Sequence, residues 1–311
     1  MRTPSPSCAV AVCTYNGSRF LREQLDSITN QSLRPSEILV SDDGSSDNTL
    51  AVAERFSKEW TAGDTRILNG PGRGYAVNFL ASLARIAPET DLVALSDQDD
   101  VWTPTKLNRA HKMLEPLGDM PALYGGATWI CDEGLKVTSK SRPLRVALGF
   151  RHAIGQNFAG GNTMVLNNAG LRLVQKAWAL SQNSVPVHDW WLYQLVSGAG
   201  GRVVYDREPC LFYRQHKTNQ IGDAAGLLAM GKRMRRMVRG DYRNWNTANL
   251  KALSACYPLL SQDNKAVLET VLAQRNGGMA QRLALMRSPG LYRQGTLGQA
   301  GLMAALALNR F

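Results

Sequence analysis

The stretch CAVAVCTYNG (residues 8–17) passes from a short apolar run directly into a polar turn. EILVSDDG (37–44) and DLVALSDQDD (91–100) follow the same plan. Runs of this length, bounded by turn residues, are typical of buried β-strands. Apolar residues recur at helical spacing over 18–29 and over about 75–86. This alternation of strands and helices predicts an α/β fold with a mostly parallel sheet and right-handed crossovers.

Polar residues follow each predicted strand at the point where it ends. Tyr15-Asn16-Gly17, Asp42-Asp43-Gly44 and the run from Asp97 to Asp100 occupy these places. In open α/β sheets, ligands bind outside the carboxyl ends of the strands. The sequence therefore predicts one binding site along this edge.

The acidic run contains Asp97, Asp99 and Asp100 within four residues. These carboxylates repel one another, so ordering them at a strand end favours a bound cation. Mg²⁺ or Mn²⁺ beside a diphosphate takes a few carboxylates together with phosphate oxygens. The alternative is a solvated acidic turn that caps the next helix.

Common nucleotide-binding motifs are missing from the sequence. No GxGxxG follows the first predicted strand and no GxxxxGK[ST] occurs, which argues against a dinucleotide oxidoreductase and a P-loop NTPase. Gly70, Gly72 and Gly74 follow a weak strand over 66–68 and are consistent with a turn. The Gly-rich stretch 158–167 either lets a substrate approach the backbone or simply bends the chain.

Two later motifs carry groups with catalytic chemistry. HDWW (188–191) places Asp189 in the first turn of a predicted helix, where the helix dipole keeps a carboxylate ionised, as a general base requires. A plain helix cap is the alternative. His216 lies beside Arg214 in the second motif, and these residue types bind metals and phosphates. A structural or exposed histidine is the alternative there.

Positive charge is concentrated in the last third of the 311 residues. The net charge is +11, and residues 201–311 hold 17 basic and 6 acidic side chains, whereas residues 1–200 hold 19 of each. This asymmetry predicts an anionic partner, either nucleic acid or an anionic membrane surface.

The five scattered cysteines indicate reduced thiols. No membrane-spanning run or secretion signal is recognisable, so we expect a cytoplasmic location.

Two C-terminal segments predict attachment to a membrane surface. The first is a basic amphipathic helix and the second is the apolar closing segment 297–311, which is too short to span a bilayer. The alternative is that both helices pack on the rest of the chain. The residues of the first helix are Leu227, Met230, Met234, Met237 and Trp245 on the apolar face, and Lys232, Arg233, Arg235, Arg236, Arg239 and Arg243 around it.

Together, the stretches 8–33, 37–49 and 95–102 resemble the N-terminal half of glycosyltransferase family 2 enzymes. DQDDVW, HDWW and YRQH resemble, more narrowly, bacterial rhamnosyltransferases of O-antigen and cell-surface polysaccharide synthesis. The resemblance covers about residues 7–222. It implies a GT-A nucleotide-sugar-binding domain over 1–222, followed by a basic helical region over 223–311.

The resemblance also assigns roles to individual residues. The family often has an Arg after the third strand, and this sequence lacks it. The phosphate contact of that Arg is therefore either missing or supplied by Arg73. In addition, His188 occupies the position where the family has Glu. Arg214 is expected to assist at the diphosphate. The other roles are nucleotide contacts by Thr14, Tyr15, Asn16, Asp43 with Asp42 beside it, and Asp97; metal ligation by Asp97, Asp99 and His216; and base catalysis by Asp189.

These roles imply an inverting glycosyltransferase that uses Mg²⁺ or Mn²⁺. The first expectation for the donor is dTDP-L-rhamnose, and the acceptor is a saccharide or a lipid-linked saccharide. A UDP-hexose is the alternative donor, and a non-enzymatic nucleic-acid binder is the alternative class. The expected location is the cytoplasm, with the chain attached peripherally to the inner face of the membrane.

Overall fold

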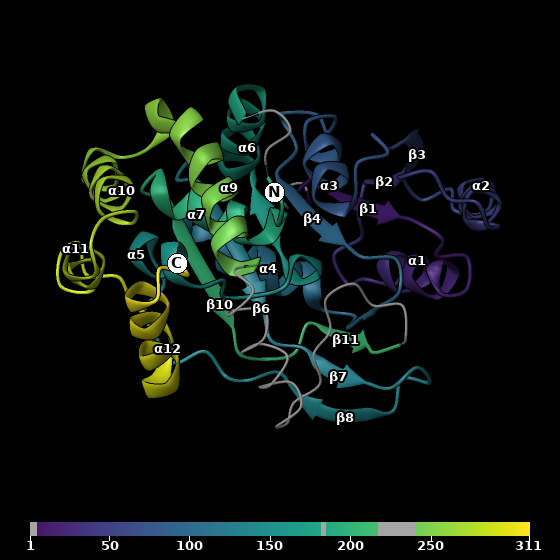
Figure 1. Ribbon diagram of the computed structural model, residues 1–311. Coiled ribbons are helices and arrows are strands. Elements are labelled where there is room, and N and C mark those ends of the chain that lie inside the picture. Colours follow the sequence, from purple (N-terminus) through teal and green to yellow (C-terminus); the bar gives the residue numbers. More distant parts are fainter. Residues whose placement is uncertain (1–4, 182–184, 217–240) are drawn as a thin grey trace.

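A seven-stranded sheet forms the centre of the computed structural model, which describes residues 5–181, 185–216 and 241–311 (Figure 1). All its strands run parallel except the third in spatial order, which is antiparallel to both neighbours. The spatial order is β10 (Arg202–Asp206), β6 (Ala122–Gly126), β9 (Val165–Asn167), β4 (Leu92–Ser96), β1 (Cys8–Thr14), β2 (Glu37–Asp42) and β3 (Asp64–Asn69).

The predicted strands and their direction are confirmed. All seven residues of β1 are buried, and they alternate between the two sides of the sheet. Ala9 and Ala11 belong to one apolar cluster, whereas Val10 and Val12 belong to the other. A central strand that is buried on both faces therefore reads as a continuous apolar run rather than as an alternating one.

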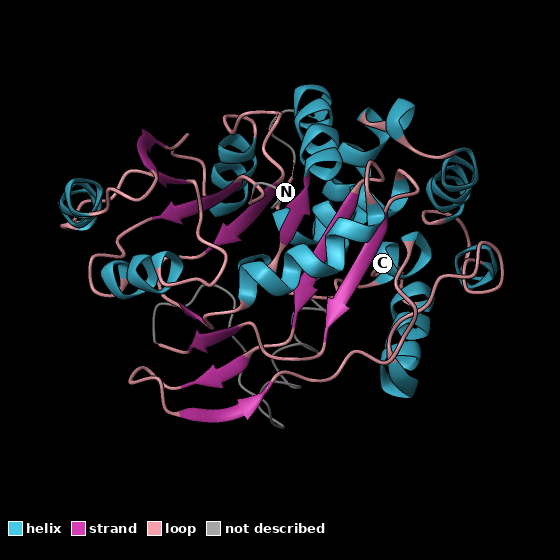
Figure 2. Ribbon diagram, turned by 180° about the vertical axis from the view of Figure 1, so that it is seen from behind, coloured by secondary structure: helices cyan, strands magenta, loops and turns pink. Residues whose placement is uncertain are grey.

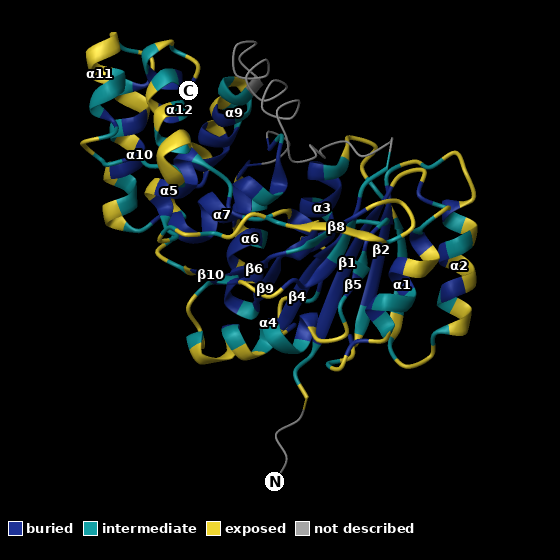
Figure 3. Ribbon diagram, turned by 90° about the horizontal axis from the view of Figure 1, so that it is seen from below, coloured by how far each residue is buried: buried dark blue, intermediate teal, exposed yellow. Residues whose placement is uncertain are grey.

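Helices cover both faces of the sheet (Figure 3). One apolar cluster includes the buried residues of α1 (Leu21–Thr29), α2 (Thr49–Glu59) and α4 (Lys106–Leu114). The other includes those of α3 (Tyr75–Leu83), α6 (Asn168–Ser181) and α7 (His188–Gly198). Shorter elements are α5 (Phe150–Gly155), η1 (Glu115–Leu117), η2 (Gly161–Thr163) and η3 (Tyr257–Leu259).

A second sheet of four short strands lies at the carboxyl edge of the large one (Figure 2). Its order is β5 (Val101–Trp102), β11 (Leu211–Arg214), β7 (Trp129–Cys131) and β8 (Val137–Lys140). Because β5 directly follows the acidic run and pairs with β11, the pairing brings the distant residues 214–216 next to residues 97–100.

The C-terminal residues form helices, as expected. These are α9 (Asp241–Ala255), α10 (Gln262–Gln274), α11 (Met279–Ala284) and α12 (Gly295–Ala307). α9 packs against α6 and α7, whereas α10, α11 and α12 lie at one end of the molecule (Figure 1). Their buried residues Leu250, Leu268 and Leu302 belong to the same cluster as those of α6 and α7. The predicted boundary at 222/223 lies outside the described residues and stays a prediction.

The structure describes only part of the predicted membrane-binding segments. Residues 227–239 lie outside the described chain, and Arg243 donates a hydrogen bond to the carbonyl oxygen of Asn309 rather than standing free. Within α12, Leu302 and Leu306 are buried, while other apolar side chains of the closing segment face solvent. No helix in the part that the structure describes is long and apolar enough to cross a membrane.

Candidate active site

A cavity of about 1040 Å³ opens at the carboxyl ends of β1, β2 and β4 and at the start of α7. It therefore lies where the strand ends predicted it. The structure brings eight of the eleven predicted site residues to its wall: Thr14, Tyr15, Asn16, Asp43, Asp97, Asp99, Asp189 and His216.

The other three predicted residues do not line this cavity. Asp42 is buried and accepts hydrogen bonds from Thr14 Oγ1 at 2.7 Å and from the N–H of Ser45 at 2.8 Å. It therefore holds the loop after β2. Arg73 is exposed between two glycines that do reach the cavity. Asp42 lies away from the cavity, whereas the predicted phosphate contact of Arg73 stays a prediction.

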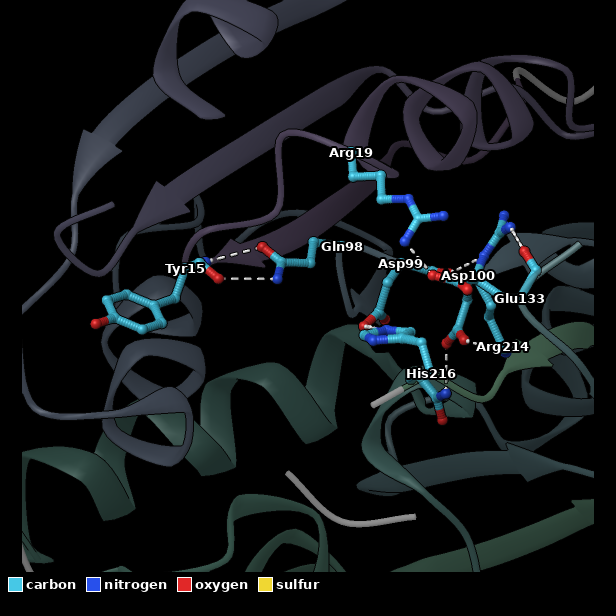
Figure 4. A network of polar contacts seen from close by, with 9 residues as sticks. Tyr15, Arg19, Gln98, Asp99, Asp100, Glu133, Arg214 and His216 are labelled. Carbon is cyan, nitrogen blue, oxygen red and sulfur yellow. Dashed lines mark hydrogen bonds and ion pairs between the residues drawn. The ribbon is translucent and has the colours of Figure 1, made fainter. Parts of the chain in front are cut away.

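Arg214 is 3% exposed and lies behind the acidic loop. Its guanidinium donates hydrogen bonds to the carbonyl oxygens of Asp99 at 2.9 Å and Glu133 at 2.5 Å, and it pairs with Glu23 (Figure 4). These contacts give Arg214 a structural role in supporting the backbone of the loop, and its predicted assistance at the diphosphate stays a prediction.

The loop after β1 is fixed by a residue that the sequence did not single out. Gln98 accepts a hydrogen bond from the N–H of Tyr15 at 2.8 Å and donates one to its carbonyl at 3.0 Å (Figure 4). Asn16, with φ of 50°, accepts from the N–H of Ser46 at 2.8 Å. Tyr15 is thereby presented at the cavity, with 52% of the residue exposed, and a flat ligand could stack on its ring.

Asp43 ties the loop after β2 to the loop after β3. Its carboxylate accepts hydrogen bonds from the N–H groups of Gly72 and Gly74, each at 2.7 Å. Gly74 has φ of 88°, a conformation that favours glycine. The Gly-rich stretch after the third strand is therefore a turn built around one carboxylate.

The acidic loop carries negative charge that the neighbouring groups only partly balance. Burial, followed by the charges of Asp99 and Asp189, raises the pKa of Asp97 to about 7. Asp99 Oδ2 lies 2.9 Å from Nε2 of His216, and Figure 4 shows the two side chains pointing toward each other. Asp100, the third carboxylate of the run, is fully buried and does not line the cavity.

The donor set of this loop suits a divalent cation that also binds the substrate. Carboxylate oxygens and an imidazole nitrogen are ligands of Mn²⁺, and Mg²⁺ prefers carboxylates with substrate phosphates. Across residues 5–181, 185–216 and 241–311, however, no group of three or more His, Cys, Asp or Glu is arranged to hold a metal ion by itself. The protein side chains offer a partial set, centred on Asp99 and His216, that phosphate oxygens would complete.

Asp189 faces the same cavity from the first turn of α7. Its carboxylate accepts hydrogen bonds from the N–H of Trp190 at 2.6 Å and from the N–H of Gly161 at 3.2 Å. Burial raises the pKa of Asp189 to about 6, and these hydrogen bonds oppose the rise. A carboxylate with a pKa just below neutrality is ionised at pH 7 yet basic enough to accept a proton.

His188, beside the candidate base, is a neutral wall of the cavity. Its ring stacks on Phe79 with centroids 4.3 Å apart, and burial lowers its pKa to about 3. Neither ring nitrogen has a hydrogen-bond partner among the described residues. His188 therefore supplies no second charge beside Asp189.

The sequence matches the family model "Glycosyl transferase family 2" over residues 9–172, which is more than half of the chain. This chain belongs to glycosyl transferase family 2. It is 29% identical over 250 residues to the dTDP-rhamnosyl transferase RfbG of Shigella flexneri, covering 78% of this chain and 84% of that protein. The family decides the class: the protein is a glycosyltransferase rather than a non-enzymatic nucleic-acid binder.

Solved structures share the fold at low sequence identity. Staphylococcus aureus TarS in complex with UDP-GlcNAc superposes with a TM-score of 0.51 at 12% identity, covering 97% of this chain and 90% of that one. The mannosyltransferase PcManGT of Pyrobaculum calidifontis, in complex with GDP-Man and Mn²⁺, gives 0.52 at 18%, covering 99% and 88%. The predicted GT-A architecture is confirmed.

Proposed function

We propose that this glycosyltransferase moves a sugar, with inversion, from a nucleoside-diphosphate sugar to a hydroxyl of a saccharide or lipid-linked saccharide in surface polysaccharide synthesis. One observation carries the proposal: a partly buried, N–H-bound carboxylate, Asp189, shares a cavity with the acidic loop of Asp97 and Asp99. One carboxylate is placed to act as a base, while the others lie where a diphosphate and its cation would bind.

In this mechanism, Asp189 removes the proton from the acceptor hydroxyl as the acceptor oxygen attacks the anomeric carbon. The new C–O bond forms on the face opposite the leaving group, and the bond to the diphosphate oxygen breaks. The N–H groups of Gly161 and Trp190 hold the carboxylate in place. General base catalysis of this kind typically contributes about 10²–10⁴-fold to the rate.

Asp99 and His216 would hold Mg²⁺ or Mn²⁺, with Asp97 beside them. When bound, such an ion neutralises charge that develops on a departing diphosphate. Burial and the neighbouring carboxylates Asp99 and Asp189 raise the pKa of Asp97, and a nearby positive charge would favour its ionised form. Tyr15 and Asn16 would contact the nucleoside from the opposite loop.

The first candidate donor is dTDP-L-rhamnose. It is supported by the similarity to the dTDP-rhamnosyl transferase RfbG, which extends over 84% of that protein. A UDP-hexose is the second candidate, and the resemblance in fold to TarS, solved with UDP-GlcNAc, is consistent with it.

A donor screen tests the proposal without knowledge of the acceptor. The protein is incubated with dTDP-L-rhamnose or a UDP-hexose, and release of the nucleoside diphosphate is measured with Mn²⁺, with Mg²⁺ and with EDTA. We expect slow hydrolysis that requires the metal and is lost in Asp99→Asn. Failure of every donor to bind or to be hydrolysed would contradict the proposal.

A further inference from the structure

Lys106, at the start of α4, is a buried cation that the proposed chemistry does not use. Its side chain is fully buried, and burial lowers its pKa to about 8. The ammonium donates a hydrogen bond of 2.5 Å to the carbonyl oxygen of Asn162 and lies 3.4 Å from the centre of the Trp102 ring. Burying a charge is unfavourable unless it is paired and hydrogen-bonded, so these contacts need an explanation beyond packing.

Asn162 connects this lysine to the acidic loop. While its backbone carbonyl accepts from Lys106, its side-chain amide donates a hydrogen bond of 2.5 Å to Asp100 Oδ2. The other oxygen of Asp100 accepts from the N–H of Arg214 at 3.2 Å (Figure 4). Asp100 therefore differs from Asp97 and Asp99: it is turned away from the cavity and ties the loop to its neighbours.

The turn that contains Asn162 also holds the candidate base. Gly161, one residue earlier, donates its N–H to Asp189 Oδ2. A Cβ atom on Gly161 would lie 2.3 Å from Nε2 of His188, so the turn touches the first residue of α7 directly. A shift of this turn would move the N–H away from the carboxylate.

We propose that Lys106, Asn162 and Asp100 are positioning residues: they form a brace that fixes the turn at Gly161, and through it Asp189, relative to the acidic loop. The inference rests on the proposed function for the role of Asp189. Its physical basis is that the base and the diphosphate-binding loop come from segments far apart in the sequence, so their spacing depends on a connection between them. Misplacement by about 1 Å can cost about 10²-fold in rate.

The first test needs no substrate. Lys106→Met removes the ammonium at nearly constant length, and Arg109→Met on the same helix is the matched control, because Arg109 contacts Asp206 and the carbonyl of Glu208 instead. We expect the amide hydrogen of Gly161 to exchange at least about 10-fold faster in Lys106→Met than in the control, since local opening exposes it. Equal exchange rates of the Gly161 amide in the two variants would contradict the proposed brace.

The second test is kinetic. We expect kcat for sugar transfer to fall by roughly 10–100-fold in Lys106→Met while the KM for the donor changes by less than about 2-fold, because the base is displaced and the donor site is not. A merely structural role would lower kcat only as far as in Arg109→Met at matched thermal stability, and that result would contradict the inference. If the wild-type protein turns over no donor, the proposed function fails, and Gly161 exchange still decides the brace.

An exchange of partners covers the case in which Lys106→Met does not fold. Asn162→Asp alone sets two buried carboxylates against each other, whereas Asp100→Asn combined with Asn162→Asp restores an amide–carboxylate hydrogen bond in the reverse direction. We expect the double variant to recover kcat by at least about 10-fold over the single variant, as residues in one network couple strongly. Absence of recovery in a folded double variant would overturn the brace.

Discussion

The strand-end loops and the C-terminal helices are two differently built regions of this protein. The cavity is lined by residues between 13 and 216, and among the described residues none from 241–311 reaches it. The C-terminal stretch 241–311 holds eight basic and three acidic side chains. It also exposes large apolar side chains: Leu272, Met279, Leu297, Met303 and Leu308.

Polar groups serve different purposes in the two regions. Around the cavity, the carboxylates of Asp97 and Asp189 are partly buried and have raised pKa values, and the N–H groups of Gly161 and Trp190 hold Asp189 in place. Such features are typical of functional sites. In the C-terminal region, large apolar side chains such as Leu297 and Leu308 remain exposed, although Arg275 is buried and donates a hydrogen bond to the carbonyl oxygen of Phe311 at 3.0 Å. We therefore expect substitutions in the first region to change turnover and substitutions in the second to change location.

The largest effect is expected for Asp189→Asn. The amide keeps an oxygen for one backbone N–H but cannot accept a proton from the acceptor, so kcat should fall by about 10²–10⁴-fold while donor affinity persists. Asp91→Asn, at the amino end of β4, is the control and should leave kcat unchanged, because among the described residues the Asp91 carboxylate accepts hydrogen bonds only from Ser7. Near-normal turnover in Asp189→Asn would remove this residue from the mechanism.

His216→Ala should change the metal requirement more than the maximal rate. Its ring contacts Asp99 at 2.9 Å, so its loss removes a ligand or an orienting partner of one. Such losses typically cost about 10–100-fold in metal affinity. Titration of activity with Mn²⁺ measures this shift. An unchanged half-saturating concentration would show that His216 does not take part in metal binding.

The pH dependence of kcat tests the role of Asp189 as a base without any substitution. Because burial raises the pKa of Asp189 to about 6, the ionised base is lost as the pH falls through that value. At saturating metal and donor, kcat should fall about tenfold for each unit below pH 6 and level off above about pH 7. A rate that stays constant down to pH 5 would contradict a base with this raised pKa.

Much of the fold could be predicted from local sequence, because β1, β2 and β4 are short apolar runs that end in polar turns. The site was predicted where the side chain follows directly from such a turn, as for Asp43 and Asp99. The role of a side chain was not predicted where the direction in which it points depends on strands that pair from distant parts of the sequence. Arg214 turns toward Asp99 and Glu133 because β11 pairs with β5 and β7, and one sequence does not reveal that pairing.

Lys106 shows a signal that sequence reasoning overlooked. It lies four residues before Ala110 and eight before Leu114, on the face of α4 that is buried. Lysine side chains are usually exposed, and a lysine on the buried face of a helix is expected to have a partner for its charge. The position therefore indicated a buried partner, although only the structure identifies it as the carbonyl of Asn162.

The smallest effect is expected on the C-terminal surface, where we propose that the chain contacts an anionic membrane. The outer side of the closing segment exposes Leu297 by 83%, Met303 by 52% and Leu308 by 62%. The exposed Arg310 lies at its end. An apolar helix face beside basic residues favours the interface of anionic lipid. In a flotation assay at low salt, the full chain should bind vesicles that contain phosphatidylglycerol more strongly than neutral vesicles.

The double variant Leu297→Ser/Leu308→Ser separates this surface from the rest of the basic region, which it leaves intact. Two leucines that are only partly buried on binding should together contribute about 1 kcal/mol, so the partition coefficient onto the anionic vesicles should fall by roughly 3–10-fold. Both side chains are exposed in the free protein, so its melting temperature and its kcat on a soluble acceptor should stay the same. Equal flotation of the two proteins would show that α12 does not contact lipid and would confine any membrane attachment to other residues.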